Sequence, residues 1–390
     1  YVRTFASVGD VSESYDWRIA YEKRKFGGFD YQIEDRKRAP FHDGHDINVL
    51  NYDSRLKVNP GFNADIRLGV VDGINEEDVF KNGELGATDN PDIDVRDYYL
   101  QTQLNFTTSS THFFHVLVSF ANYDRRQRWP IEVPESVVNC LANGNSLFDD
   151  ANNCFQPGGS PLTANVNSDS EDSRLEFELQ DTLLFSDDLK LVTGLGFRKD
   201  TYRSETLFDG RGNNYQSRVF GNLEYTPINW LTLNAGGNWE RTTTTNDGYF
   251  SPRLAANFTL GNNHALRFVY SKAVRTPDGF EQDPDYGYTL KDVRPTQYAL
   301  YEGVRVENTL VNRDVELEEE SIISREISYF GQFPTNTGQL SLEVRVFKDK
   351  MRDMISGIIG FEDWTIDNNV DIDQKGFEVE AAMEYPGTTF

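Results

Sequence analysis

Residues 249–283 read YFSPRLAANFTLGNNHALRFVYSKAVRTPDGFEQD and decide the fold class. Apolar side chains fall on every second position on both sides of the Gly-Asn-Asn turn at 261–263: Leu254, Ala256 and Phe258 before it, and Leu266, Phe268 and Tyr270 after it. Period-two alternation around such a turn predicts an antiparallel β-hairpin with one apolar and one polar face. Residues 317–350 repeat the design, so we expect a chain built mainly of such hairpins.

The composition restricts the class of protein further. The chain has 390 residues, of which 38% are hydrophobic and 13% aromatic, and its formal net charge is −25. No apolar run approaches the roughly 18 residues of a membrane helix. Strands that cross a membrane alternate their apolar residues, so the mean hydropathy of −0.59 is compatible with them. The acidic balance argues against a nucleic-acid partner, which requires a basic face.

The alternation predicts an all-β fold of about sixteen antiparallel strands, with the first at 2–9, the third at 29–37 and the last at 371–384. Tight turns and long polar loops alternate between them. We expect the tight turns on one rim, at 26–28, 59–61, 186–188, 227–229, 261–263 and 334–338. We expect the long loops on the other rim, at 73–94, 126–171 and 275–316. Many strands reach ten residues and carry charges in mid-strand, which favours a transmembrane β-barrel with short periplasmic turns over a soluble sandwich.

Several motifs resemble the barrel of TonB-dependent outer-membrane receptors. They are SPRL at 251–254, KAVRTP at 272–277, FE at 280–281, LEEE at 317–320, REISY at 325–329 and KGFEVE at 375–380. Their order and spacing also match, over most of the chain. The resemblance implies a barrel of 22 strands with an N-terminal plug domain. It implies import of an iron-siderophore, haem, cobalamin or sugar across the outer membrane, with energy supplied by TonB.

The chain departs from that pattern at both ends. It begins at Tyr1 without an initiator Met, residues 2–9 already read as a strand, so we expect residues 1–390 to contain no plug, and residues 385–390 read as a turn. We therefore expect residues 1–390 to be a partial barrel domain, with about 16 of 22 strands, whose first strand rises from the periplasm. Such a piece should form an open trough with no regular ladder between residues 3–8 and 378–384.

Three functions are considered. The expected one is an outer-membrane active-transport receptor that takes up a scarce ligand, a ferric siderophore, with TonB contacting the plug region and membrane lipid surrounding the wall. The alternative is a passive 16-stranded porin, which would seal its first strand to its last. A third class, an outer-membrane hydrolase, lacks a visible Ser-His-Asp constellation. The sequence therefore favours a protein that is not an enzyme and that has no cofactor.

Aromatic and arginine side chains in the expected outer loops are candidates for contacting the ligand, since they suit a flat, anionic metal chelate. They are Arg125, Arg126, Arg128, Trp129, Tyr286, Tyr288, Arg294, Tyr298, Tyr301 and Trp364. Many of these residues are explained equally well as part of the belt of side chains at the membrane–water interface. His42 and His45 are weak metal candidates, because no further ligands are visible, and a solvated polar turn explains them better.

The only two cysteines, Cys140 and Cys154, lie in the longest expected loop. Outer loops of such a barrel face an oxidising environment, in which disulfides persist. We therefore predict that Cys140 and Cys154 are paired.

Overall fold

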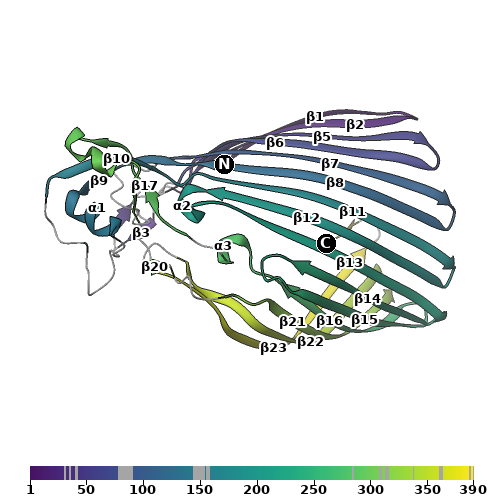
Figure 1. The fold of residues 1–390 in the computed structure, drawn as a ribbon. Helices are drawn as coiled ribbons and strands as arrows, with labels where there is room; N and C mark the ends of the chain where they lie inside the picture. Colours follow the sequence, from purple (N-terminus) through teal and green to yellow (C-terminus); the bar gives the residue numbers. More distant parts are fainter. Residues whose placement is uncertain are drawn as a thin grey trace.

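The computed structural model describes residues 1–29, 32–34, 37–39, 43–77, 91–143, 154, 159–282, 285–306, 310–311, 316–336, 338–359, 363–385 and 388–389. Nearly all of them belong to one large antiparallel sheet that curves into a trough (Figure 1). The predicted all-β antiparallel fold is therefore confirmed.

Apart from the short β20 (Leu310–Val311), which pairs with β23, each strand of this sheet pairs with the next one along the chain. In order, the strands are β1 (Val2–Val11), β2 (Tyr15–Phe26), β5 (His45–Asn59), β6 (Phe62–Asn75), β7 (Ile93–Ser109), β8 (His112–Arg126), β11 (Ser170–Ser186), β12 (Leu189–Ser204), β13 (Gly210–Ile228), β14 (Leu231–Thr242), β15 (Gly248–Leu260), β16 (His264–Arg275), β21 (Glu320–Thr335), β22 (Gly338–Ile359), β23 (Asp363–Tyr385) and β24 (Thr388–Thr389).

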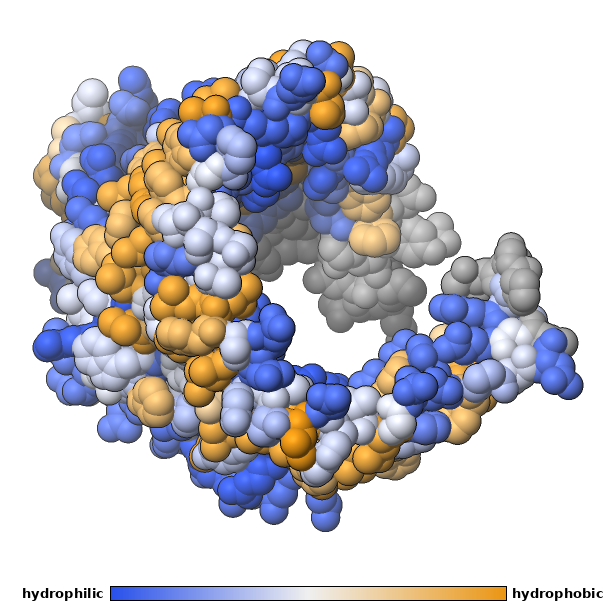
Figure 2. Space-filling model, turned by 90° about the vertical axis from the view of Figure 1, so that its right-hand side faces the viewer, coloured by the Kyte–Doolittle hydropathy of each residue, from blue (hydrophilic) through white to orange (hydrophobic). Residues whose placement is uncertain are grey.

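We call this large sheet the wall. Alternation of apolar and polar residues along its strands gives the wall two different faces. On β11 and β12, Leu175, Phe177 and Leu195 are 44%, 37% and 44% exposed and share one face. Glu176 and Glu178 lie between them and point to the other face, because successive strand residues point to opposite sides. Figure 2, seen from the rim of short turns, shows hydrophilic side chains around a central opening and many hydrophobic ones outside it. We call the inner face the lumen face and the other the outer face.

Most connections are sorted by length between two rims, as predicted, although the short connection 243–247 between β14 and β15 lies on the same rim as the long loops. Short turns join β1 to β2, β5 to β6, β7 to β8, β11 to β12, β13 to β14, β15 to β16 and β21 to β22, and all lie at one end (Figure 1). The long connections 76–92, 127–169 and 276–319 lie at the other end. We call these ends the short-turn rim and the long-loop rim.

The prediction for residues 26–37 is wrong. The expected third strand at 29–37 does not join the wall, because Gln32–Glu34 (β3) and Lys37–Ala39 (β4) pair with each other and with no other strand of the described residues. β2 therefore pairs directly with β5, and the turn at 26–28 opens a long connection on the long-loop rim. β1 accordingly runs toward the short-turn rim, so the expectation of a rising first strand is also wrong.

The wall does not close between its first and last strands. Within the described residues β1 pairs only with β2, and β23 pairs with β22, β24 and the short β20 (Leu310–Val311). Figure 2 shows the corresponding break in the ring. The predicted absence of a ladder between residues 3–8 and 378–384 is confirmed.

Segments of two long connections form a small folded unit at the long-loop rim, which we call the loop domain. Its elements are β9 (Arg128–Pro134), α1 (Glu135–Ala142), β10 (Pro161–Asn167), β17 (Tyr288–Thr289), β18 (Lys291–Arg294), η1 (Thr296–Tyr301) and β19 (Arg305–Val306). β9, β10 and β18 form one sheet, and β17 pairs with β19. Its core is closed to solvent, since Ile131, Leu162 and Leu290 are 0% exposed. Among the described residues, no helix is long and apolar enough to cross a membrane.

A disulfide fastens α1 to the chain that follows it. Cys140 and Cys154 are bonded, with their Cα atoms 5.5 Å apart, which confirms the predicted pair. Their sequence separation is 14 residues, and closing a loop of that size stabilises the folded state by about 3 kcal/mol in the chain-entropy model.

We predict that replacing both cysteines with serine loosens α1 and leaves the wall intact. Limited proteolysis with mass spectrometry should show faster cleavage near residues 140–154 in the variant than in the wild-type protein. The hairpins, which are held by their own ladders, should be cut at an unchanged rate and serve as the internal control. Equal cleavage near residues 140–154 in both proteins would contradict the prediction.

Candidate ligand site at the mouth of the lumen

Cross-strand ion pairs cover the lumen face. Arg218 on β13 donates to Glu176 at 3.2 Å and to Glu178, two residues further along β11. Arg55 on β5 donates twice to Asp65 on β6, at 2.6 and 3.0 Å. Opposite charges on neighbouring strands stabilise a sheet, and the pairs leave a polar wall suited to contact with water.

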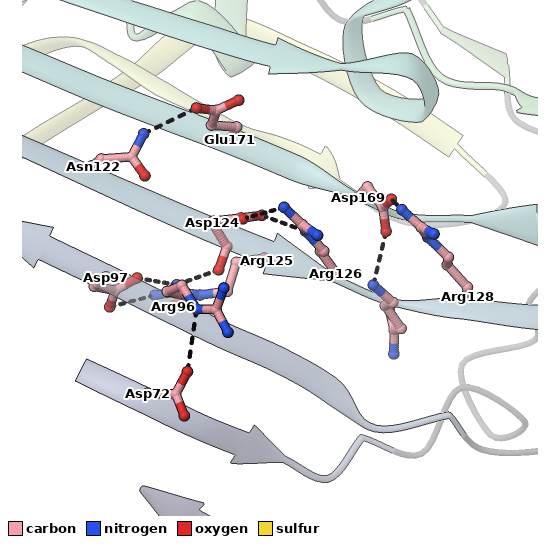
Figure 3. Close-up of polar contacts among 11 residues, drawn as sticks. Asp72, Arg96, Asp97, Asn122, Asp124, Arg125, Arg126, Arg128, Asp169 and Glu171 are labelled. Atoms are coloured by element: carbon pink, nitrogen blue, oxygen red, sulfur yellow. Dashed lines mark hydrogen bonds and ion pairs between the residues drawn. The ribbon is translucent and has the colours of Figure 1, made fainter. Parts of the chain in front are cut away.

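The three neighbouring candidate arginines occupy three different environments (Figure 3). Arg125 lies on the lumen face, and its guanidinium holds the carboxylate of Asp97. Arg126 points to the outer face and pairs with Asp124 at 2.8 Å. Arg128 starts the loop domain and pairs with Asp169 at 2.6 Å. The structure therefore does not gather these side chains in one site, and each is already paired with a carboxylate.

Most of the candidate aromatic residues lie inside the loop domain. Trp129, Tyr288, Tyr298 and Tyr301 are 2%, 0%, 6% and 6% exposed, and all belong to its core. The Trp129 and Tyr288 rings meet edge to face with their centroids 5.6 Å apart. Burial on this scale gives the four rings a packing role, so their faces are not available to a ligand in this structure.

The remaining candidates are scattered. Tyr286 packs against the core of the loop domain, and Arg294 is exposed on β18. The side chain of Trp364 and all of His42 lie outside the described residues. His45 begins β5, with its ring centroid 5.6 Å from that of Phe26. Among the residues that the structure describes, no group of three or more His, Cys, Asp or Glu side chains could hold a metal ion.

A pocket of about 620 Å³ opens on the lumen face below the long-loop rim. The wall strands β8, β11, β12 and β13 contribute its polar lining, and α2 (Glu205–Phe208) and α3 (Gly279–Gln282) contribute apolar rings. Its charged and aromatic lining residues are Tyr123, Asp172, Arg174, Arg198, Asp200, Tyr202, Phe208, Asp278 and Phe280. None of these was among the sequence candidates. The sequence carries little signal for them, since Asp172 lies between Glu171 and Ser173, and only Arg174 adjoins the alternating run that starts at Leu175.

The polar and aromatic parts of this pocket are both held in place. Asp200 accepts hydrogen bonds from Arg174 at 2.7 Å and from Arg198 at 2.8 Å. The ring centroid of Tyr202 lies 4.7 Å from that of Phe208. A Cβ atom at Gly279 would come within 2.2 Å of the Tyr202 ring, so only glycine lets α3 approach so closely. The pocket therefore combines fixed hydrogen-bond donors with a preformed aromatic edge.

Three of the quoted motifs meet in one ion-pair network beside the pocket. Arg275 of KAVRTP donates to both carboxylate oxygens of Glu281, at 2.9 and 3.0 Å, and also to Glu320 of LEEE. Glu320 in turn accepts from the backbone N–H of Ile355 at 2.6 Å. The network ties α3 to β16, β21 and β22, and it brings together three motifs that lie far apart in the sequence.

A second set of contacts attaches the loop domain to α2. Lys291 donates to the carboxylate of Glu205 at 2.6 Å, and Asn167 donates to it at 3.2 Å. The buried hydroxyl of Thr206 donates to the carbonyl of Asn167 at 2.5 Å. Burial alone would raise the pKa of Glu205, but these hydrogen bonds outweigh it and lower the pKa below its ordinary value.

The fold is that of a large antiparallel wall with a polar lumen, short turns on one rim and a folded loop domain on the other. The family model for the TonB-dependent receptor-like β-barrel matches residues 25–389. The chain therefore belongs to the TonB-dependent receptor family. A comparison with curated protein sequences finds no match.

Solved structures of receptors and transporters share the fold. The hemophore receptor HasR of Serratia marcescens aligns with a TM-score of 0.66 and 13% identity, over 98% of this chain and 61% of that one. The siderophore receptor PirA of Pseudomonas aeruginosa aligns with a TM-score of 0.64 and 13% identity, over 98% of this chain and 59% of that one. The copper transporter OprC aligns with a TM-score of 0.64 and 14% identity, over 99% and 58%. The chain thus spans about three fifths of the length of these proteins.

We predict that Arg275→Met releases α3 from the wall. The variant loses charge-assisted hydrogen bonds and leaves Glu320, whose side chain is 10% exposed, without its cation. After allowance for the half-exposed arginine, the expected loss of stability is about 2 kcal/mol. Hydrogen exchange should accelerate at Ile355 and residues 279–282. Arg174→Met is the matched control, because Asp200 keeps Arg198, and it should leave exchange at Ile355 unchanged; unchanged exchange in both variants would refute the role of Arg275.

We also predict that acid loosens the loop domain through Glu205. A carboxyl group whose pKa is lower in the folded state stabilises that state fully above its unfolded value, and the contribution is lost as the pH falls through the folded pKa. Proteolysis of residues 159–167 and 288–306 should therefore accelerate when the pH drops below about 4, near the ordinary value of a glutamate. Glu205→Gln should already be cleaved faster at neutral pH and should respond less to acid. An equal response in both proteins would assign the effect to other groups.

Proposed function

We propose that this chain is part of a bacterial outer-membrane receptor that imports a scarce ligand with energy delivered by TonB. Membership of the TonB-dependent receptor family is the observation that carries the proposal. The exposed apolar outer face supports a position within a lipid bilayer, and the polar lumen face supports passage of a solute. On this proposal the protein is a transport receptor and not an enzyme. Its partner TonB would contact the plug region of the full-length receptor.

The family assignment and the missing ladder between β1 and β23 both favour the receptor over the passive porin. A porin of this size would need its first and last strands paired, since edges without partners are costly in lipid.

The ligand that we propose is a ferric siderophore bound in the lumen pocket. Proteins with this fold include a siderophore receptor, a hemophore receptor and a copper transporter, so the fold alone does not select the ligand. The lining of the pocket does favour one kind of chelate. Arg174 and Arg198 face three carboxylates, those of Asp172, Asp200 and Asp278, which leaves one net negative charge. This balance favours an uncharged ferric tris-hydroxamate over a trianionic ferric tris-catecholate.

Binding of both chelates to the full-length protein in detergent tests this proposal. Tryptophan fluorescence should report saturable binding, with the tris-hydroxamate bound more tightly. Asp172→Asn removes a negative charge from the pocket and should raise affinity for the tris-catecholate about three- to fivefold, with little effect on the neutral chelate.

Asp124→Asn is the matched control, because Asp124 lies on the outer face of the neighbouring strand and should change neither affinity. Binding of neither chelate would refute the siderophore assignment. Equal effects of the two variants would place the site outside the lumen pocket.

A further inference from the structure

The outer face carries a row of cations that form no ion pair with any carboxylate among the described residues. Arg325 on β21 lies directly opposite Lys348 on β22, and Lys348 lies directly opposite Lys375 on β23. All three side chains are exposed. Neighbouring strands are about 4.8 Å apart, so the three charges fall within about 10 Å. We call these three residues the cationic row.

The cationic row by itself destabilises the sheet. Like charges directly opposite each other destabilise a sheet, and this chain carries a formal net charge of −25. Within the described residues, no ion pair joins Arg325, Lys348 or Lys375 to a carboxylate. The nearby carboxylate of Asp373 is held by Arg352 at 2.7 Å. An anion supplied from outside the chain would remove the repulsion.

Outer-face charges on the opposite side of the wall are arranged differently. Lys23 pairs with Asp46 at 2.8 Å, Arg96 with Asp72 at 3.2 Å, and Arg126 with Asp124 at 2.8 Å. Figure 3 shows the last two pairs. Those three cations are neutralised within the chain, in contrast to the three of the cationic row.

An apolar hollow of about 740 Å³ adjoins the row on the same outer face. Arg325 and Lys348 form one border, and the small side chains of Ala235 and Ala256 leave space in its floor. The surrounding apolar residues are Leu233, Leu254, Phe268, Ile327 and Val346, which are 38–54% exposed. An apolar hollow bordered by cations matches a molecule that has an acyl chain joined to an anionic head.

We propose that the hollow and the cationic row together bind one phosphorylated, multiply acylated glycolipid of the membrane leaflet on the long-loop side. A phosphate group contacts Arg325, Lys348 and Lys375, and one acyl chain fills the hollow. Guanidinium and ammonium groups both bind phosphate through charge-assisted hydrogen bonds. The inference rests on the proposed outer-membrane location, but it concerns the outer face and is independent of the ligand in the lumen.

The test measures lipid binding by the full-length protein in detergent, with bis-phosphorylated lipid A as the probe. Native mass spectrometry should show one retained lipid on the wild-type protein. The triple variant Arg325→Gln, Lys348→Gln, Lys375→Gln should lose at least tenfold in affinity. The matched control Lys23→Gln, Arg96→Gln, Arg126→Gln also removes three positive charges, from the side where they are paired, and should bind as the wild type does.

Two further measurements distinguish binding of the whole lipid from binding of its acyl chains or of phosphate alone. Lipid A stripped of its phosphates should bind at least tenfold more weakly, and inorganic phosphate alone should not displace the intact lipid at millimolar concentration. Equal binding of the stripped lipid, displacement by free phosphate, or an unchanged triple variant would each overturn the proposal.

Binding of the ferric chelates should be the same in the wild type and the triple variant. A triple variant that retains chelate binding and loses the lipid supports the lipid site. A protein that binds the lipid but neither chelate would refute only the proposed siderophore ligand and leave the lipid site standing.

Discussion

The continuous antiparallel ladder is the constraint on which the other features of this structure depend. In a bilayer, a backbone N–H or C=O without a partner costs several kcal/mol, because no water can replace it. Apart from the short β20 and β24, each strand of the large sheet is at least ten residues long and is paired along most of its length. Once the ladder is continuous, alternation assigns every side chain to the lumen or to the outer face. The locations of the ion pairs, the lumen pocket and the outer hollow all follow from that assignment.

The same rule explains what could be predicted from the sequence. Strand positions, the order of the turns and the polarity of the two faces depend on local alternation, which is visible in the residues themselves. Residues 29–37 show the limit of this reasoning. They alternate like a wall strand, but a strand joins the wall only if its neighbours pair with it, and β2 pairs with β5 instead. Because the prediction included this one extra strand, it gave β1 the wrong direction and assigned the turn at 26–28 to the wrong rim.

The loop domain could not be predicted from loop composition, although its strands were visible. Trp129, Ile131 and Val133 alternate with polar residues or proline, and so do Leu162, Ala164 and Val166. Period-two alternation inside a long polar loop indicates a small sheet with its own core. Interpreting the same residues as part of an outer loop without a core made Trp129 a ligand candidate. The pairing of β10 with β18, which are more than a hundred residues apart, closes that core and depends on tertiary structure alone.

Whether a residue stands at an odd or an even position of its strand (its parity) decides which face it points to, and therefore which charged residues can act together. Arg125 and Arg126 are adjacent in sequence, but one contacts the lumen and the other the outer face, so they cannot bind the same molecule. Arg174 and Arg198 are 24 residues apart, yet they meet at Asp200 because β11 and β12 present the same parity to the lumen. Arg325, Lys348 and Lys375 meet on the outer face for the same reason. In a wall of this kind, binding sites follow the register between strands, so clusters of charge in the sequence are a poor guide to them.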